Sequence, residues 1–371
     1  MEKNRYQIVD IVKAIGIISI IIGHTLTVLP LTGLKIGSFV YLFHITIFFF
    51  VIGFCYNIKY TENQAMFIGK RIIRILIPFL IYNTVFVFLH NLLVNINLID
   101  DGPYSKADIA KNIVTGLILE TNESMLGAFW FLPVLVIACI IFSLSFQFSN
   151  KLSNIFNRNK FVLHTTMIII MTSIAFLGFY FHDHEFNLRF HMQTAFLCAP
   201  VIYIGFIVKI IYPKIKEYLG LMTFLIAIIS LKLFLDHGYN IELAYNQYAS
   251  KYLFYPISII GIIFCLSLGH LLLKLKYVKG VLIFIGRNSF HYMALHFIVI
   301  KIIDLVVWNI KKDSIDVLRL FPKSYDLGLL YVIITVLVIT LSIVVAKLLK
   351  KKFNRFYIKL KKTMKANFSK I

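Results

Sequence analysis

The sequence predicts an all-α fold, a polytopic membrane bundle of about ten transmembrane helices. Hydrophobic residues make up 59% of the 371 residues, well above the roughly 45–50% of soluble domains. A helix that crosses a hydrocarbon core of about 30 Å needs roughly 20 apolar residues, and the chain contains many such runs. The formal charge of +21 does not imply nucleic-acid binding, because basic residues in membrane proteins gather in the cytoplasmic loops.

Ten runs are expected as membrane spans. They lie near residues 8–29, 38–57, 72–95, 127–148, 161–181, 192–211, 218–235, 252–273, 280–303 and 327–346. An even number of spans places both ends of the chain on one side of the membrane. The expected organisation is a transmembrane domain over residues 1–346 followed by a basic cytoplasmic tail over residues 347–371.

The charges of the loops indicate which side that is. Lysines and arginines concentrate in the loops on the side of the amino terminus, near residues 59–74, 151–160, 209–216 and 274–279. Most acidic residues fall in the opposite loops. Because positively charged loops stay in the cytoplasm, both termini are expected to be cytoplasmic. The lipid bilayer, whose inner surface is anionic, is an expected partner of the basic tail.

The first span carries two ionisable residues, Lys13 and His24, within the stretch DIVKAIGIISIIIGH. They stand eleven residues apart, close to three helical turns, so both side chains project from nearly the same face. About 16 Å separates them along the helix axis at 1.5 Å per residue. Lys13 is expected near the cytoplasm and His24 near the outer surface. Ionisable residues inside a membrane usually face the bundle interior and mark functional sites.

Two further histidines are expected near the depth of His24. His44 lies about six residues from the outer end of the second span, and His296 lies in the outer half of the ninth. His24 and His44 each have an alternative explanation, a hydrogen bond that packs two helices together. The ninth span also places Arg287 toward its inner side, where an arginine needs a partner or an anionic ligand.

A basic cluster stands at the cytoplasmic end of the third span, formed by Lys70, Arg71 and Arg74. Arg71 and Arg74 are three residues apart and share a helix face. The sequence leaves two explanations open. The cluster can anchor the helix at the cytoplasmic surface. It can also bind phosphate, since a guanidinium group offers two parallel hydrogen bonds to a phosphate, and Lys13 lies close in depth.

The outer loops offer few specific chemical signals. Trp130 follows the long acidic loop over residues 96–126 and suits either a membrane-interface anchor or a stacking platform for a sugar. The segment 181–191 is rich in histidine and acidic residues, yet its spacing matches no standard metal site. The four cysteines lie in apolar runs without a C-x-x-C pair, so neither a redox site nor a metal is expected.

Five motifs, taken in their order along the chain, carry a resemblance to a known family. They are DIVKAIGIISIIIGH, FHITIFFFVIGF, KRIIRILIPF, WFLPVL and IGRNSFHYMALH. Together they resemble the acyltransferase-3 family of integral-membrane acyltransferases. The closest resemblance is to its fucose 4-O-acetylase-like branch, which modifies bacterial surface polysaccharides. The resemblance implies about ten helices, in agreement with the loop charges, and a location in a bacterial cell membrane.

The resemblance assigns roles to residues of the first and third spans. The family's first-helix motif is a basic residue, ten residues and a histidine, which implies that His24 is catalytic and that Lys13 is required with it. The family's arginine pair matches Arg71 and Arg74. One position departs from the pattern, because Ile52 stands where the family usually has serine before the glycine. No role is assigned at that position.

The expected function is O-acyl transfer across the membrane. An acyl-coenzyme A, with acetyl-CoA as the expected donor, docks from the cytoplasm and delivers its thioester to His24. His24 acts as a general base on a sugar hydroxyl or as a nucleophile that takes the acyl group, and the sequence leaves both open. His44 is expected to orient His24 or to polarise the carbonyl. The expected acceptor is a cell-surface polysaccharide or a lipid-linked glycan.

The other expected site residues divide between the two substrates, and Trp130 and His296 are assigned to the acceptor. The donor's phosphates are expected to meet Lys13 and the cations Lys70, Arg71, Arg74 and Arg287. Two other functions would use the same buried charges. One is a transporter or flippase for a lipid-linked saccharide, against which the chain shows no internal repeat. The other is a non-catalytic component of a polysaccharide synthase or export assembly.

Overall fold

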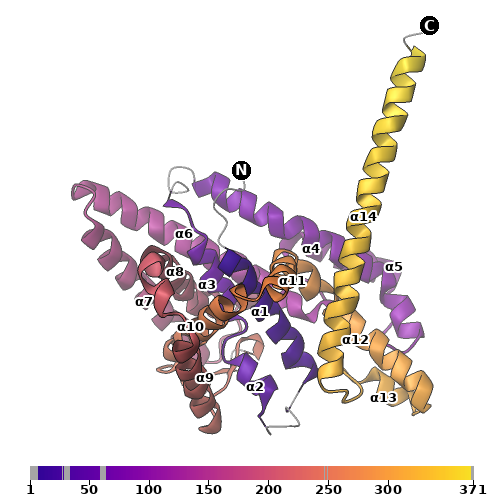
Figure 1. Ribbon diagram of the computed structural model, residues 1–371, viewed down its shortest axis with the longest axis horizontal. Coiled ribbons are helices and arrows are strands. Elements are labelled where there is room, and N and C mark those ends of the chain that lie inside the picture. Colours follow the sequence, from indigo (N-terminus) through magenta and orange to yellow (C-terminus); the bar gives the residue numbers. More distant parts are fainter. Residues whose placement is uncertain are drawn as a thin grey trace.

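The computed structural model describes residues 7–26, 28, 34–58, 64–245, 247–248 and 250–368. Figure 1 shows an assembly of helices, and the sheet found within the described residues is one short two-stranded hairpin. Nine helices in this part of the chain are long and apolar enough to cross a membrane. The chain is therefore an all-α, multi-pass membrane protein, as its composition predicts.

The helical elements follow the order of the expected spans. The candidate spans are α1 (Gln7–Thr25), α2 (Ile36–Tyr41) with α3 (Thr46–Phe54), α4 (Gln64–Asn95), η3 (Ser124–Trp130) with α6 (Phe131–Ile155), α7 (Lys160–Asp183), η4 (Arg189–His191) with α8 (Met192–Ile215) and η5 (Lys216–Tyr218), α10 (Phe254–Leu273), α12 (Ser289–Lys311) and α14 (Leu329–Phe368). The shorter elements are α5 (Lys106–Thr115), η2 (Gly116–Ile118), α9 (Leu221–Asp236), β1 (Ile241–Glu242), η6 (Leu243–Tyr245), β2 (Gln247–Tyr248), α11 (Lys276–Arg287) and α13 (Ile315–Arg319).

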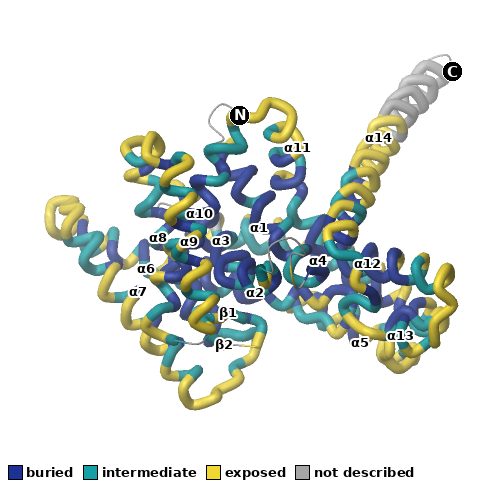
Figure 2. The backbone as a smooth tube through the Cα atoms, turned by 60° about the horizontal axis from the view of Figure 1, so that its bottom comes forward, coloured by how far each residue is buried: buried dark blue, intermediate teal, exposed yellow. Residues whose placement is uncertain are grey.

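Helix α1 lies at the centre of the bundle. It packs against α2, α3, α10, α11, α12 and α14, and Figure 2 shows it buried along most of its length. Its polar side chains therefore face other helices, as expected for polar groups in a membrane. In Figure 1, α1 begins and α14 ends on the same side of the bundle. The expected placement of both termini on one side of the membrane requires this arrangement.

The expected span over residues 218–235 forms a helix that is shorter than the hydrocarbon core is thick. It forms α9, which has 16 residues and a length of about 24 Å at 1.5 Å per residue. A hydrocarbon core is about 30 Å thick, so α9 alone does not match a full crossing. It lies against α10. Together with the nine longer helices found in the described residues, α9 completes the predicted bundle of about ten.

The expected ninth span, 280–303, is wrong as a single helix. The structure divides it into α11 and α12 at Asn288, whose Nδ2 donates to the Phe284 carbonyl at 2.6 Å. A side chain that takes a backbone carbonyl in this way competes with helical hydrogen bonding. Helix α12 then runs on to Lys311. As a result Asp304, expected in an outer loop, is fully buried within a helix.

The second expected span, 38–57, is also interrupted. Residues 42–45 form a turn between α2 and α3, and His44 lies in that turn. Two side chains take backbone carbonyls there, since His44 Nδ1 donates to Val40 O at 2.9 Å and Thr46 Oγ1 donates to Phe43 O at 3.0 Å. The turn leaves the His44 ring inside the bundle and only 5% exposed.

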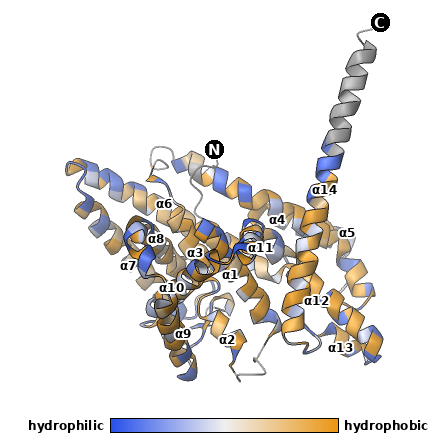
Figure 3. Cartoon of the chain, viewed as in Figure 1, coloured by the Kyte–Doolittle hydropathy of each residue, from blue (hydrophilic) through white to orange (hydrophobic). Residues whose placement is uncertain are grey.

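Helix α14 continues without a break past residue 346, where the transmembrane domain was expected to end. In Figure 1 it projects beyond the bundle. Figure 3 shows its surface changing from hydrophobic to hydrophilic where it leaves the other helices. This change follows from the basic residues Lys347, Lys350, Lys351 and Lys352. The expected boundary thus separates two surfaces of one helix rather than two elements.

Helices α3 and α8 approach each other closely at two glycines. A Cβ added at Gly53 would lie 1.7 Å from the carbonyl oxygen of Ile202, and one added at Gly205 would lie 2.1 Å from that of Phe50. Membrane helices come this near only where small residues face the partner backbone. Gly53 is the glycine of the second-span motif, so the structure gives that position a packing role.

Replacing Gly53 with alanine is expected to lower the free energy of unfolding by about 2 kcal/mol or more, because the new methyl group overlaps the α8 backbone. The measurement is the thermal unfolding midpoint of the purified protein in detergent. Gly69→Ala is the matched control, since Gly69 also lies in a helix but has no atom within 4 Å of an added Cβ. Equal midpoints for the two variants would contradict the packing role.

Candidate active site

A cavity of about 560 Å³ lies beside the carboxyl-terminal end of α1. Its lining includes His24 from α1, His44 from the turn between α2 and α3, and Trp130 from η3. The volume falls within the roughly 300–1,000 Å³ of sites that bind small molecules. We call it the outer cavity, because the predicted topology places this end of α1 outside.

Two of the expected histidines, His24 and His44, line the outer cavity, while His296 is fully buried against His24 and is not part of the lining. The ring of His24 stacks on that of His296 with 5.4 Å between centroids, and His44 lines the same cavity. His44 Nδ1 bonds to the Val40 carbonyl at 2.9 Å, and His296 Nδ1 bonds to the Met293 carbonyl at 2.8 Å. A carbonyl oxygen only accepts, so in each neutral ring the proton sits on Nδ1 and the lone pair on Nε2.

The nitrogen atoms of these rings retain bonding capacity. His296 Nε2 is buried and has no hydrogen-bond partner. His24 stacks on His296 and also meets the ring of Phe297 at 4.8 Å, and the hydrogen bonds of the described residues include none to its imidazole. A buried polar atom without a partner costs free energy and calls for an explanation. For His24, which lines the outer cavity, a polar ligand in that cavity supplies one.

Residues from distant loops complete the wall of the outer cavity. Glu242 from β1, Tyr245 from η6 and His191 from η4 all line it. Burial raises the pKa of the Glu242 carboxyl above its usual range. Glu242 was not among the expected site residues, since an acid in an outer loop carries no signal beyond topology. His191 was counted with a metal-like segment, but its ring lies 5.4 Å from that of Trp130.

A second cavity of about 180 Å³ lies on the inner side of the first. Lys13 and Arg71 both line it, so the structure brings together these two expected cations. Phe48 and Phe131 line both this inner cavity and the outer cavity, and their ring centroids lie 5.8 Å apart. These two aromatic side chains therefore form the partition between the two cavities.

The other expected cations lie elsewhere. Lys70 and Arg74 are exposed on α4, and Lys70 Nζ contacts Met66 Sδ at 3.2 Å. Arg287 Nε bonds to Asp10 at 3.1 Å. Asp10 is fully buried and also lies 3.5 Å from Lys13 Nζ. The structure thus separates Arg71 from Arg74, which a shared helix face had suggested would act together.

The structure gives the positions of the expected site residues. A comparison of the sequence with known families indicates which type of reaction the protein catalyses. The sequence matches the family model of an acyltransferase domain, acyltransferase-3, over residues 6–347. The chain belongs to the acyltransferase-3 family. No match was found among curated proteins or among solved structures. The protein is therefore a membrane-embedded enzyme that transfers acyl groups.

A buried ion pair holds one rim of the outer cavity in this acyltransferase. Lys301 and Asp304, both fully buried on α12, lie 3.6 Å apart. Lys301 Nζ donates to the Leu320 carbonyl at 2.8 Å, and Asp304 accepts from the Ser324 backbone N–H at 2.9 Å. Breaking a buried pair typically costs about 3–5 kcal/mol. The segment that it fixes contains Phe321, which lines the cavity.

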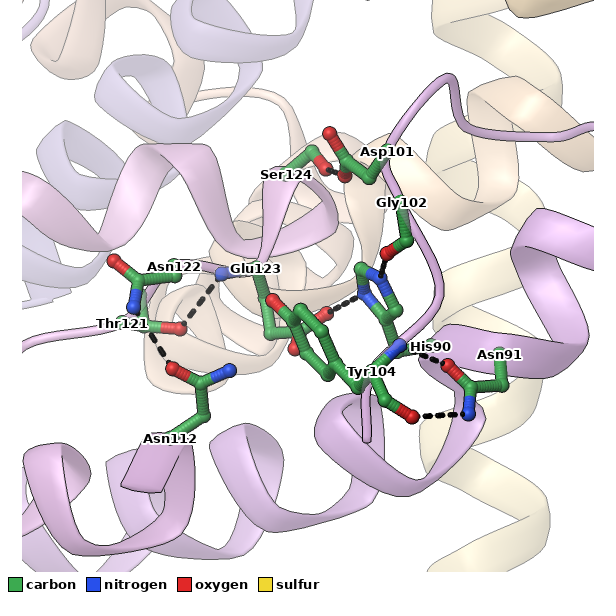
Figure 4. Close-up of polar contacts among 10 residues, drawn as sticks. All are labelled: His90, Asn91, Asp101, Gly102, Tyr104, Asn112, Thr121, Asn122, Glu123 and Ser124. Atoms are coloured by element: carbon green, nitrogen blue, oxygen red, sulfur yellow. Dashed lines mark hydrogen bonds and ion pairs between the residues drawn. The ribbon is translucent and has the colours of Figure 1, made fainter. Parts of the chain in front are cut away.

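A second buried pair holds the long outer loop of the acyltransferase. His90 Nδ1 lies 3.2 Å from Glu123, His90 Nε2 bonds to the Gly102 carbonyl at 2.9 Å, and the Tyr104 ring stacks on the imidazole at 3.5 Å. Figure 4 shows these groups converging from α4 and the loop. Burial raises the pKa of Glu123. Glu123 directly precedes η3, so this cluster positions the element that carries Trp130.

The histidine-rich segment 181–191 does not assemble a metal site. Its members point to different partners, since His182 meets the ring of Tyr248 at 4.0 Å and Asp183 pairs with Lys251 at 2.8 Å. Across the described part of the acyltransferase, no three histidine, cysteine, aspartate or glutamate side chains are grouped so that they could hold a metal ion.

Proposed function

We propose that this acyltransferase moves an acetyl group from cytoplasmic acetyl-CoA to a hydroxyl of a glycan on the outer side of a bacterial cell membrane. The observation that carries the proposal is the pair of cavities that share Phe48 and Phe131 as their partition. One cavity holds cations and the other holds histidines. Two substrates can therefore approach the same point from opposite sides.

The dimensions and charges of the inner cavity support a place for the donor. A volume of about 180 Å³ is smaller than the roughly 300–1,000 Å³ of complete ligand sites, but it suits the narrow pantetheine arm of CoA. Arg71 then meets the phosphates of CoA, for which a planar guanidinium is well matched, while Lys13 lines the same cavity with its ammonium 3.5 Å from Asp10. Arg287 contributes through its ion pair with Asp10 rather than as a phosphate ligand. The exposed Lys70 and Arg74 remain available only to groups outside the cavity.

In the transfer step the thioester passes the partition that Phe48 and Phe131 form, and its carbonyl reaches His24. As a general base, His24 takes the proton of the sugar hydroxyl while the hydroxyl oxygen attacks the carbonyl carbon. The C–S bond breaks, and the proton passes from the imidazolium to the CoA thiolate. As a nucleophile, His24 first forms an acyl-imidazole, which the hydroxyl then resolves. Acetyl label that stays on the protein when no acceptor is present identifies the second route.

The polar lining of the outer cavity supports a glycan as the acceptor. Trp130 presents an aromatic face of the kind that packs against sugar rings. His44 lines this cavity and can orient hydroxyl groups, while His296 stacks on His24 from outside the lining. An apolar acceptor would leave the imidazoles that line the cavity without a polar partner there. A cell-surface polysaccharide and a lipid-linked glycan both fit, and the resemblance to the fucose 4-O-acetylase-like branch favours the former.

Transport of a whole saccharide is one of the two other functions that the sequence left open. It would need a route wide enough for a sugar along the full bundle. The aromatic partition and the smaller inner cavity narrow that route on one side, and the family is one of acyltransferases. These observations favour transfer of a small acyl group over passage of the glycan.

Replacing His24 with alanine is expected to lower acetyl transfer at least about a hundredfold, because a positioned acid–base group contributes roughly 10²–10⁴ in rate. The assay follows labelled acetyl-CoA into the host's surface glycan, using membranes with equal amounts of each variant. His184→Ala is the matched control, since His184 is exposed directly after α7 and its Nδ1 bonds to the Tyr180 carbonyl. Wild-type activity in the His24→Ala protein would overturn the proposal.

Replacing Arg71 with alanine is expected to raise KM for acetyl-CoA about tenfold or more while kcat changes little. The physical reason is that a hydrogen bond from a charged group contributes about 1.5–3 kcal/mol to ground-state binding. Steady-state kinetics at saturating glycan separate the two constants. Arg74→Ala, an exposed arginine on the same helix, serves as the comparison. An equal rise in KM for both variants would show that the inner cavity does not select the donor.

A further inference from the structure

Next to the outer cavity lies a recess of about 250 Å³ that no step of the proposed transfer uses. The two share Gly127, Trp130 and His191 as lining residues, so they adjoin across the Trp130 indole. The recess alone is smaller than the roughly 300–1,000 Å³ of a complete ligand site. Its size and position are those of an extension of the outer cavity rather than of a separate site.

The lining of the recess combines aromatic faces with hydrogen-bonding groups, which include the Glu120 carboxylate in its pair with Arg189. Trp130 and Phe190 supply the aromatic faces, and Thr121, Asn122 and His191 supply the other polar groups. Figure 4 shows the amide nitrogen of Asn122 turned toward Asn112, to which it donates at 2.8 Å. The amide oxygen of Asn122 is then left as an acceptor.

The backbone around the recess is held in an uncommon conformation. Leu119, Phe190 and His191 all line it, and their φ angles are +61°, +60° and +52°. Residues other than glycine seldom adopt this left-handed region. Such conformations persist where the surrounding structure enforces them, often at ligand sites. In this case they turn consecutive side chains, Phe190 and His191, into the same recess.

The charges at the recess are already compensated. Arg189 binds Glu120 through two hydrogen bonds, Nε to Oε1 at 2.9 Å and the terminal nitrogen to Oε2 at 3.0 Å. This guanidinium holds the pKa of Glu120 below its usual range. The ion pair also ties the segment after η2 to η4, which are the two walls of the recess. Among its described lining residues there is no lysine or arginine.

We propose that this recess binds a second, neutral sugar unit of the acceptor glycan, next to the unit that is acylated in the outer cavity. The proposal rests on the proposed function and specifies its acceptor as a chain of at least two sugars. A sugar ring matches both parts of the lining, because its C–H face packs on an aromatic ring while its hydroxyls donate and accept hydrogen bonds.

Other ligand classes match the recess less well. An acyl chain would cover the amide oxygen of Asn122 and the hydroxyl proton of Thr121 with apolar groups and leave both without a partner. A phosphate would meet the Glu120 carboxylate and find no cation that is not already paired in this recess. A neutral saccharide avoids both penalties. The resulting specificity is for glycan chain length, independent of the acyl donor.

The test measures binding without requiring transfer. The chain has two tryptophans, so Trp308→Phe leaves Trp130 as the single indole reporter. The probes are the monosaccharide and the disaccharide released from the host's surface glycan by partial hydrolysis. The disaccharide is expected to bind at least tenfold more tightly than the monosaccharide, as followed by the fluorescence of Trp130. Equal affinities would overturn the proposal.

Asn122→Tyr in the same background is expected to fill the recess and bring the ratio of the two affinities close to one. If this variant shows a lowered thermal midpoint, Thr121→Val serves in its place, because it removes a hydroxyl at nearly constant volume and should reduce the ratio severalfold. A ratio unchanged in a folded variant would count against the recess. Tighter disaccharide binding without any acetyl transfer would sink the proposed function alone, whereas transfer without a length preference would sink the second sugar site alone.

Discussion

The bundle depends on the ion pairs that the buried carboxylate of Asp10 makes. A charge within a membrane is tolerated only when other groups compensate it. Here Lys13 lies 3.5 Å away on the same helix, and Arg287 reaches in from the end of α11 at 3.1 Å. The backbones meet closely at that point, since a Cβ on Gly286 would lie 1.7 Å from Asp10 O. The break at Asn288 lets α11 dock in this way while α12 carries His296 to His24 at the other end of α1.

This central helix thus connects two environments that differ in charge. Its inner end faces a small cavity with Arg71, and its outer end faces a larger one lined by His24, His44, His191 and Trp130. Two phenylalanine rings separate them. Buried pairs on α4 and α12 then hold the loops that form the outer walls. The proposed transfer depends on the partition between the two cavities. The second sugar site depends on the loops that form the outer walls.

Much of the fold follows from hydropathy and loop charge, which predict about ten helices because every backbone polar group in a bilayer needs an internal partner. The eleven-residue spacing of Lys13 and His24 predicts that the two side chains share a face of the first helix, one near each end, and in the structure Lys13 lines the inner cavity and His24 the outer one. Hydropathy does not show where a side chain donates a hydrogen bond to a backbone carbonyl. The helix breaks at Asn288 and at His44 could therefore not be predicted from it. Nor does local pattern show which of Arg71 and Arg74 faces the interior. Glu242 enters the site through a distant loop, which only the packing of the whole chain determines.

The most direct test of the central claim, transfer between two sides, uses sealed vesicles that hold the protein in one orientation. Acetyl-labelled acetyl-CoA is supplied only on the lysine-rich side, and glycan only on the opposite side. The account predicts labelled glycan on the far side, with free CoA thiol released only on the side where the donor was added. Label that forms only when donor and glycan share one side would contradict it, because both substrates would then enter through the same opening.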